Sequence, residues 1–461
     1  MITPPQRARV CALALLSFSI LIPTTSLQAL PATMETRVIN GIADDRSGAI
    51  AFTGGVVVVA AGDERQDATL LIRNGEVVAI KNGSEVPEGY QQVELKGRYV
   101  YPGLVDLYSN YGMPEQKPSS RSRYRGPELL DSTSTTASNA AESIRSHVNA
   151  VELFTNDDKQ AAEYRKLGFT TVVSFNPDGI ARGTSVAVLT DGNLPNLSVL
   201  KEKTATHYSF DKGSAHQMLP ISRMGVVALL RQTYLDADWF AAQQSRPFTD
   251  LSLEAWNNTK SLPKIMSAFD WKTTLLADKL GDEFGDQYII KGGGDEYQRL
   301  DAIKSSNATM IIDVAFPEAP NVTDPLTVGR VSLEQLKHWE LAPYNLGRLE
   351  SVGIPFVITS KDSGKKFWKN LRLAVKSGLS EDAALQALTM IPAELMGEAA
   401  KVGSLEPGKL ANFIITDKPL FASKSQLLQT WIKGQRFDVA VQSDLEPGEY
   451  ELSFNERSMQ V

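Results

Sequence analysis

The fold of this chain is decided by residues 97–112, which read Gly97-Arg98-Tyr99-Val100-Tyr101-Pro102-Gly103-Leu104-Val105-Asp106-Leu107-Tyr108-Ser109-Asn110-Tyr111-Gly112. Residues 100–108 predict a mostly apolar strand that the Pro-Gly pair interrupts once. The carboxyl end of this strand carries the polar side chains of Tyr108 and Asn110 into a loop. Because α/β barrels place their functional residues at such strand ends, the stretch predicts the functional face of a barrel.

Helices and strands alternate over the middle of the chain. A helix over 158–167 is followed by Gly168 and a β-branched strand over 169–175, which is one repeat of a parallel barrel. Later repeats have the same order, and their elements are a helix over 224–237, a strand over 287–290, a helix over 295–304, a strand over 309–314, a helix over 347–352 and a strand over 354–359. No dinucleotide-binding fingerprint follows these strands, so the pattern favours a barrel over an open doubly wound sheet.

Short strands are expected near both chain ends. The Asn74-Gly75 pair joins apolar runs over 68–73 and 76–80, which predicts a tight hairpin because both turn positions need positive φ. Towards the carboxyl end, residues 431–432 are expected to pair with residues 437–438, and 450–454 form a last strand.

A secretory signal peptide is predicted over residues 1–32. Arg7 and Arg9 precede the apolar run 10–22, and small residues follow over 27–32. The apolar run is shorter than the roughly 20 residues that span a bilayer, so a membrane anchor is the less favoured alternative. The single cysteine, Cys11, lies in this segment. A mature protein without cysteine has no disulfides and no thiolate ligands, which favours a periplasmic or secreted protein.

The composition and the net charge limit the classes of partner that this chain is expected to bind. The chain has 42% hydrophobic and 22% charged residues, which is typical of a globular protein with a large core. Its net charge of -7, with both signs mixed along the sequence, argues against a nucleic-acid partner, which would require a basic face. Beyond the signal peptide no stretch is apolar and long enough to cross a membrane, so no membrane contact is expected.

A family resemblance is carried by the opening stretch and by four others, at 166–172, 180–184, 222–226 and 402–416. Their order and spacing together resemble the exported, imidazolonepropionase-related members of the amidohydrolase superfamily. The resemblance implies an α/β fold, with a TIM-type (β/α)8 barrel of the amidohydrolase kind and a composite β-sandwich formed by both chain ends. It also implies a hydrolase that acts on C–N bonds other than peptide bonds.

The resemblance also implies the domain boundaries. The barrel is expected over 101–404, with a long loop over 113–147. The composite β-sandwich is expected to combine residues 50–100 with residues 405–456.

The family's metal ligands are absent from the matching positions. That family holds a divalent metal with two histidines after the first barrel strand and with histidines that end the fifth and sixth strands, and an aspartate that ends the eighth strand is the general base. The matching side chains here are Tyr108 and Asn110 on the first strand, Lys291 and Asp313 at the expected ends of the fifth and sixth, and Lys361 or Asp362 at the eighth. Ammonium groups bind metals only after losing a proton, so we expect no metal and no other cofactor.

The expected site is therefore a ligand pocket at the barrel mouth. We expect it to be lined by Tyr108, Asn110, Lys291 and Asp313, with Asp362 and Lys361 as the catalytic candidates if the protein is an enzyme. The run 291–294, Lys-Gly-Gly-Gly, suggests either an anion-binding nest or a plain strand-to-loop turn, and the turn is favoured.

The histidines are not expected to rebuild a metal site, because none of them forms a one-apart or four-apart pair. His147 and His338 fall in helical surroundings, while His207 and His216 lie in a polar stretch. Histidines with satisfied hydrogen bonds or with solvent contact are the expectation for all four.

Two classes of function stay open. In the first, the chain is a catalytically silent barrel, a pseudoenzyme, that binds a small-molecule ligand or supports an intact amidohydrolase homologue. In the second, it is an active hydrolase of cyclic amides or peptide-derived substrates with an atypical site, and zinc or another divalent metal is then its cofactor.

Overall fold

The computed structural model describes residues 48–115, 129–245, 248–323, 328–440, 451–454 and 457–460. All of these residues belong to one compact unit, 46–461. The predicted signal peptide, residues 1–32, lies outside the described residues. Within the described part, no helix combines the length and the apolar character needed to span a membrane.

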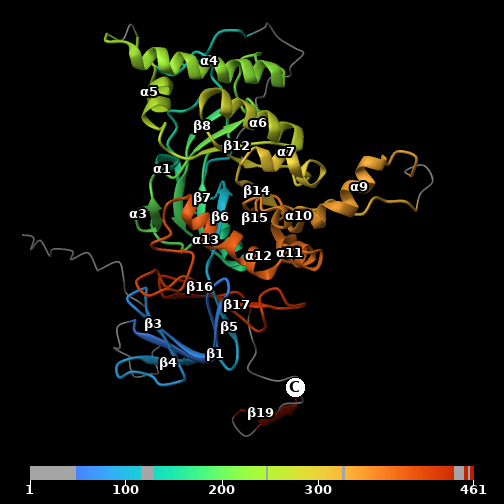
Figure 1. Ribbon diagram of the computed structural model, residues 1–461. Coiled ribbons are helices and arrows are strands. Elements are labelled where there is room, and N and C mark those ends of the chain that lie inside the picture. The colour runs from blue at the N-terminus through green and yellow to red at the C-terminus, as the bar shows by residue number, and fades with distance from the viewer. Residues whose placement is uncertain are drawn as a thin grey trace, which may run out of the picture. The chain divides into compact units, whose positions relative to one another are not determined.

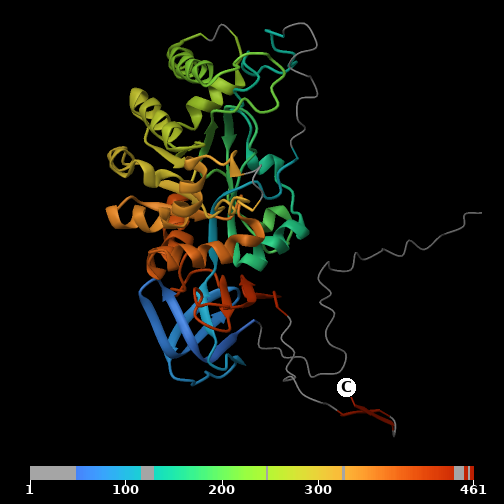
Figure 2. The same cartoon turned by 90° about the vertical axis from the view of Figure 1, so that its right-hand side faces the viewer.

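One sheet combines strands from both halves of the sequence. Its order is β18-β17-β16-β5-β1-β2-β3, and β4 pairs with β1. The strands are β1 (Ile50–Ala60), β2 (Asp63–Arg73), β3 (Glu76–Asn82), β4 (Gln91–Glu94), β5 (Tyr99–Pro102), β16 (Phe413–Thr416), β17 (Leu427–Ile432) and β18 (Gln435–Asp438). Figure 1 shows the blue strands β1 and β5 beside the red strands β16 and β17, and Figure 2 shows the same neighbourhood from the side.

The join between the two halves is the antiparallel pairing of β5 with β16. Phe413 lies opposite Pro102 in this register. Phe413 is fully buried and packs in one cluster with Phe52 and Trp431, whose ring centroid lies 4.9 Å from that of Phe52. Aromatic rings bury large areas, so this cluster ties the sheet together. At the β2–β3 hairpin Asn74 has a φ of 53°, as the predicted turn requires.

The last predicted strand does not join this sheet. β19 (Glu451–Phe454) pairs with β20 (Arg457–Gln460) in a separate two-stranded sheet. The expectation that residues up to 456 complete the β-sandwich is therefore wrong. β20 follows β19 after two residues, so pairing β19 with β20 closes a short loop, whereas pairing β19 with the edge of the large sheet would close a long one at a greater entropic cost.

The barrel strands are β6 (Leu104–Ser109), β7 (Phe169–Ser174), β8 (Ala181–Thr184), β9 (Val186–Leu189), β11 (Thr206–Ser209), β12 (Lys264–Ser267), β13 (Tyr288–Lys291), β14 (Met310–Asp313) and β15 (Phe356–Thr359). β6 pairs with β7, and β11 to β15 follow one another in parallel. The consecutive strands β8 and β9 fill the third place in the barrel and run antiparallel to β11 and β7. β10 (Val199–Lys201) pairs with the outer edge of β9.

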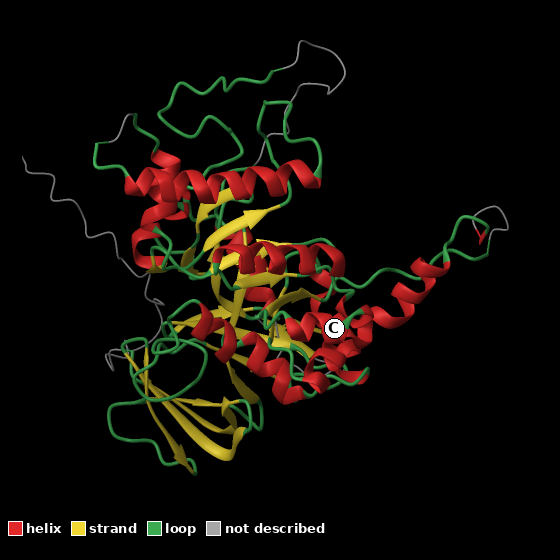
Figure 3. Ribbon diagram, turned by 45° about the horizontal axis from the view of Figure 1, so that its top comes forward, coloured by secondary structure: helices red, strands yellow, loops and turns green. Residues whose placement is uncertain are grey.

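Most of the helices cover the outside of the barrel, where Figure 3 shows them in red around the yellow strands, whereas the helix Leu333–Leu341 extends away from the barrel and buries none of its residues. They are α1 (Ala150–Leu153), α2 (Asp158–Leu167), α3 (Pro195–Ser198), α4 (Arg223–Ala242), α5 (Leu251–Asn258), α6 (Trp271–Phe284), α7 (Leu300–Ser305), α9 (Leu333–Leu341), α10 (Asn345–Val352), α11 (Phe367–Lys376), α12 (Glu381–Leu388) and α13 (Met390–Leu395), with 3-10 turns η1 (Glu296–Gln298), η2 (Ala342–Tyr344) and η3 (Gly364–Lys366). The helix predicted over 295–304 is thus split into η1 and α7.

Alternation along the strands separates two cores. Met266, Ile290 and Ile312 point outwards and pack against the helices. Ile265, Ile289, Ile311, Val357 and Val105 point inwards and form an apolar layer with residues of α13. The next inward positions towards the carboxyl ends of the strands are therefore the floor of the barrel mouth.

The predicted long loop 113–147 is only partly described, since residues 116–128 are outside the described residues. Its described part consists of turns and is tied to the barrel by the bridge between Ile144 and Ala181.

Candidate functional site at the barrel mouth

Polar side chains follow the apolar layer at the carboxyl ends of the barrel strands. Ser267 ends β12, Lys291 ends β13 and Asp313 ends β14, and each points inwards by the alternation that buries the preceding isoleucines. These ends are the fifth, sixth and seventh around the barrel. The predicted assignment of Lys291 to the fifth strand and Asp313 to the sixth is therefore wrong by one strand.

The missed strand is β12, whose four residues Lys-Ile-Met-Ser show little strand pattern. The neighbouring β11 was also missed. The fifth strand thus ends at Ser267, which again offers no imidazole at that place.

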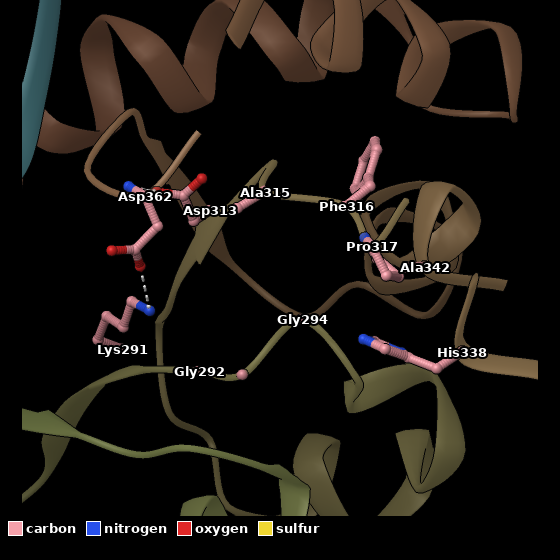
Figure 4. A pocket seen from close by; sticks show the side chains of 11 residues that line it. Lys291, Gly292, Gly294, Asp313, Ala315, Phe316, Pro317, His338, Ala342 and Asp362 are labelled. Carbon is pink, nitrogen blue, oxygen red and sulfur yellow. Dashed lines mark hydrogen bonds and ion pairs between the residues drawn. The ribbon is translucent and has the colours of Figure 1, made fainter. Parts of the chain in front are cut away.

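Lys291, Asp313 and Asp362 lie together. Lys291 Nζ is 3.1 Å from Asp362 Oδ2, in an ion pair that Figure 4 marks with a dashed line. The backbone N–H of Asp362 donates to Asp313 Oδ2 at 2.6 Å. Asp313 is only 9% exposed, and its other oxygen, Oδ1, is buried with no hydrogen-bond partner among the described residues.

Burial sets the protonation of this group. It raises the pKa of Asp313 to about 7, and the N–H of Asp362 counteracts it only partly. For Lys291 burial lowers the pKa, but the charge and hydrogen bond of Asp362 outweigh burial, and the pKa is raised. Lys291 is therefore a firmly protonated ammonium, while Asp313 changes its charge near neutral pH.

Asn110 and Lys361 form a second pair beside this group. Lys361 Nζ donates a hydrogen bond to Asn110 Oδ1. Burial lowers the pKa of Lys361, although several nearby carboxylates act in the opposite direction.

Tyr108 belongs to an aromatic cluster deeper in the barrel. Its ring centroid lies 4.7 Å from that of Phe175 and 6.0 Å from that of His207. The buried Arg182 approaches the Tyr108 hydroxyl at 3.5 Å. Tyr108 is thus held by aromatic packing, although it lies within electrostatic range of Lys291 and contributes to the raised pKa of that lysine.

His207 contradicts the expectation made for it. It lies on β11 and is 1% exposed, and its ring stacks on Phe175 with centroids 3.8 Å apart. Both of its ring nitrogens are buried and lack a hydrogen-bond partner among the described residues. Burial, with a smaller effect of Arg182, lowers its pKa well below the usual value, so the ring is neutral. The sequence signal that could have placed it on a strand is its position between the β-branched Thr206 and the aromatic Tyr208, both of which favour strands.

The other histidines have partners. His147 lies in a turn rather than a helix, and its Nδ1 is 2.8 Å from Ser252 Oγ. His216 is 3.5 Å from a carboxylate oxygen of Glu142. His338 is on α9, where its Nδ1 is 3.1 Å from the Tyr297 hydroxyl.

Asp106 was not singled out as a site residue, yet it is the most connected carboxylate of the mouth. It is fully buried on β6 and accepts hydrogen bonds from the Tyr108 N–H, the Thr359 hydroxyl, and both the N–H and the hydroxyl of Ser360. Burial raises its pKa although these donors oppose the rise. Asp106 therefore holds the first strand to the eighth and positions the residues that follow both.

A cavity of about 210 Å³ opens between the ends of β13, β14 and β15 and helix α9. Its polar wall is Lys291, Asp313 and Asp362, and the glycines 292–294 form its floor. Figure 4 shows Phe316, Pro317, His338 and Ala342 on the opposite wall, and Ala315 beside Asp313. Tyr108, Asn110 and Lys361 do not line this cavity, so the four predicted pocket residues are divided between two places.

The glycine floor is a packed turn. Gly292 faces the buried Glu296, which accepts a hydrogen bond from the Gly294 N–H at 3.2 Å and one from Asn345 Nδ2 at 2.6 Å. The chain's own carboxylate therefore occupies the place that an external anion would need.

The donor set does not fit the divalent metal that the resemblance implies. Among the described residues no group of three or more His, Cys, Asp or Glu side chains could hold a metal ion. Lys291 keeps its proton, and the oxygen of Asn110 is engaged by Lys361.

Known proteins resemble this chain over most of its length. The family model described as "Amidohydrolase family" matches residues 346–437. Imidazolonepropionase of Klebsiella pneumoniae is 24% identical over 368 residues, which are 76% of this chain and 85% of that protein. Adenine deaminase 2 of Jannaschia sp. is 38% identical over 66 residues, which are 14% of this chain and 10% of that protein.

A solved structure supports the same conclusion for the fold. An amidohydrolase from Thermotoga maritima aligns with a TM-score of 0.65 and 21% identity, covering 84% of this chain and all of that one. The predicted fold class, a TIM-type barrel with a composite β-sandwich, is thereby confirmed. The fold, the matching carboxyl-terminal segment and the long alignment to imidazolonepropionase together support membership of the amidohydrolase superfamily.

Proposed function

We propose that this chain is a catalytically silent amidohydrolase-superfamily barrel that binds a small-molecule ligand at its mouth. The observation that carries the proposal is the ammonium group of Lys291 at the end of the sixth strand, paired with Asp362 at the end of the eighth. In the family the corresponding strand ends supply a metal ligand and the general base. In this chain the charges of Lys291 and Asp362 at those two strand ends neutralise each other.

The charge balance supports this reading. A divalent metal placed at the mouth would face the protonated Lys291 and the ammonium of Lys361, and repulsion between like charges would oppose its binding. The ion pair and the Asn110 bond occupy the positions that a metal would need, so a hydrolytic water has no Lewis acid to activate it.

A specific observation favours the second candidate, an active amidohydrolase of cyclic amides or peptide-derived substrates. Asp313 has a pKa of about 7 and one free, buried oxygen, which are the properties of a general acid or base at neutral pH. Asp362 lies beside it and accepts from Lys291. Zinc or another divalent metal is the cofactor under this candidate.

Metal content and turnover separate the two. The purified mature protein is analysed for metals beside an imidazolonepropionase purified in the same way, and both are assayed on imides, lactams and dipeptides. The proposal predicts well under one metal ion per chain and no turnover. One bound metal per chain that is lost in Asp313→Asn or Asn110→Ala would overturn it.

We also propose that the protein is exported to the periplasm or secreted, on the evidence of residues 1–32. Cell fractionation followed by amino-terminal sequencing tests this. A new amino terminus near Ala29 or Ala32 in the periplasmic fraction is the expected result, whereas an uncleaved chain in the cytoplasm contradicts it.

A supporting role beside an intact amidohydrolase homologue is the second form of the silent-barrel proposal. Its structural basis is an apolar stripe on one face of α4, where Met224 is 84%, Leu235 57% and Trp239 48% exposed. Large exposed apolar side chains in a row are typical of contact surfaces. Co-purification of such a homologue, lost in Leu235→Glu and retained in the control Gln91→Glu at an exposed position of β4, is the expected result. A chain that stays solitary, or that pairs only with itself, contradicts it.

A further inference from the structure

We propose that the cavity beside α9 binds a small organic ammonium compound, with its N–H groups on Asp313 Oδ1 and its apolar body against Phe316, Pro317 and Ala342. This inference rests on the proposed ligand-binding function and names the chemical class of the ligand.

The first argument is the free oxygen of Asp313. Its partner oxygen, Oδ2, is occupied by the Asp362 N–H at 2.6 Å, while Oδ1 is buried without a hydrogen-bond partner among the described residues. A buried acceptor left without a donor costs about 1–3 kcal/mol, and more when it is charged. Oδ1 is closed off from the cavity in this structure, so a turn of the Asp313 side chain that brings Oδ1 to a ligand N–H recovers this cost on binding.

The second argument is charge. Lys291 lines the same cavity, but it forms its ion pair with Asp362. An anionic ligand would have to displace Asp362 from Lys291 before it could bind there. Lys361, the second ammonium group that would repel a metal ion at the mouth, does not line this cavity, and the charge of Lys291 is balanced by Asp362. A singly charged ammonium ligand therefore meets the carboxylate of Asp313 without displacing any group, and the cavity favours it over an anion.

The third argument is the shape of the walls. In Figure 4 the polar groups Lys291, Asp313 and Asp362 lie on one side, and Phe316, Pro317 and Ala342 lie on the other. A volume of about 210 Å³ corresponds to roughly seven water molecules at about 30 Å³ each. This accommodates an amine with a branched chain of a few carbons rather than a large substrate.

Three probes of one shape test the class: 3-methylbutylamine, 3-methylbutanol and 3-methylbutanoate. Their binding is measured by calorimetry at pH 8 in the presence of EDTA. The amine is expected to bind at least tenfold more tightly than the alcohol and the anion. Preferential binding of the anion, or no binding of the amine, would overturn the inference.

Asp313→Asn is expected to weaken amine binding at least tenfold. The matched control is Glu318→Gln, because Glu318 is exposed and pairs with Lys366 outside the cavity. If Asp313→Asn fails to fold, Phe316→Ser serves instead and is expected to weaken the amine and 3-methylbutanol by a similar factor, because both place the same apolar body against this wall; unchanged affinity for the amine in this variant overturns the inference. Unchanged amine affinity in a folded Asp313→Asn variant also overturns the inference.

The pH dependence gives an independent readout. The charged groups around Asp313 are Lys291 on β13, Lys361 and Asp362 after β15, and His338 on α9. Because Asp313 has a pKa of about 7, a proton competes with the ammonium ligand at low pH. Amine affinity is expected to fall roughly tenfold from pH 8 to pH 6. In Asp313→Asn, which keeps His338, this dependence should disappear, and its persistence contradicts the assignment.

The outcomes of this test differ from those of the metal test. Binding of the amine together with metal-dependent turnover would end the silent-barrel proposal and leave the ligand class standing. Failure of all three probes in a metal-free, inactive protein would end the ligand class and leave a scaffold.

Discussion

Thr359 on β15 donates a hydrogen bond of 2.7 Å to Asp106 on β6, and this bond joins the last barrel strand to the first. The second carboxylate oxygen of Asp106 accepts from the N–H of Ser360 at 3.0 Å and from its hydroxyl at 2.8 Å. The side chain of Asp106 thus connects β6 to β15, two strands that share no backbone ladder among the described residues.

Asp106→Ala should lower the free energy of unfolding by about 4 kcal/mol, because it leaves several buried donors without an acceptor. Urea unfolding followed by fluorescence measures the change. The control Asp131→Ala, at an exposed loop position, should change it by less than about 0.5 kcal/mol. Equal effects of the two substitutions would show that Asp106 does not close the barrel.

His207→Phe should leave the protein as stable as before, or more stable, at neutral pH. It removes two buried nitrogens that lack partners and keeps an aromatic ring against Phe175. Thermal unfolding at pH 7.5 measures this.

The same variant should also lose acid sensitivity. The folded-state pKa of His207 lies below the usual 6.5, so the unfolded chain takes up a proton that the folded chain does not. The wild type should therefore lose up to about 1.4 kcal/mol per pH unit as the pH falls below 6.5. The slope should be smaller in His207→Phe and unchanged in the control Gln386→Asn, at an exposed position of α12.

Asp313 should make the protein less stable as the pH rises. Its folded-state pKa of about 7 exceeds the ordinary 3.8, so its protonated form is favoured by folding. The contribution is full below pH 4 and is lost progressively up to pH 7, with a limit of about 4 kcal/mol. Asp313→Asn should lack this loss. Parallel curves for wild type and variant between pH 4 and 7 would contradict the raised pKa.

Gly292→Ala should lower the free energy of unfolding by about 2 kcal/mol. A Cβ at this position would lie 2.0 Å from Glu296 Oε1 and 2.9 Å from Met310 Cε, and Glu296 is held by Asn345. Gly294→Asn is the matched control, because its Cβ meets open space and asparagine tolerates a φ of 86°. Chemical unfolding of both variants distinguishes a packed turn from a loose one.

Much of the fold was predictable because its signals are local. The helix over 158–167 and its Gly168 end, which has a φ of 89°, follow from side-chain periodicity and a single glycine. The β2–β3 hairpin follows from Asn74-Gly75 in the same way. β12 was missed because four residues, Lys264–Ser267, are held in place by neighbours on both sides rather than by their own pattern.

The site was predictable as a set of strand ends but not as a set of contacts. Position alone brought Lys291 and Asp313 to the mouth. Tyr108 does not line their cavity, because it packs with Phe175 and His207, which come from the residue after β7 and from β11. Asp106 was overlooked because its importance arises from donors about 250 positions later in the sequence, a range at which local pattern carries no signal.

The pairing of β5 with β16 has a consequence for how the protein is made. Pro102 lies opposite Phe413, so a ribosome must add roughly 310 residues before β5, which already pairs with β1 on one side, obtains its neighbour on the other side. During that interval a nascent chain exposes an open strand edge, to which another unfinished chain can attach. Any fragment that stops before residue 413 keeps this edge permanently and is expected to aggregate.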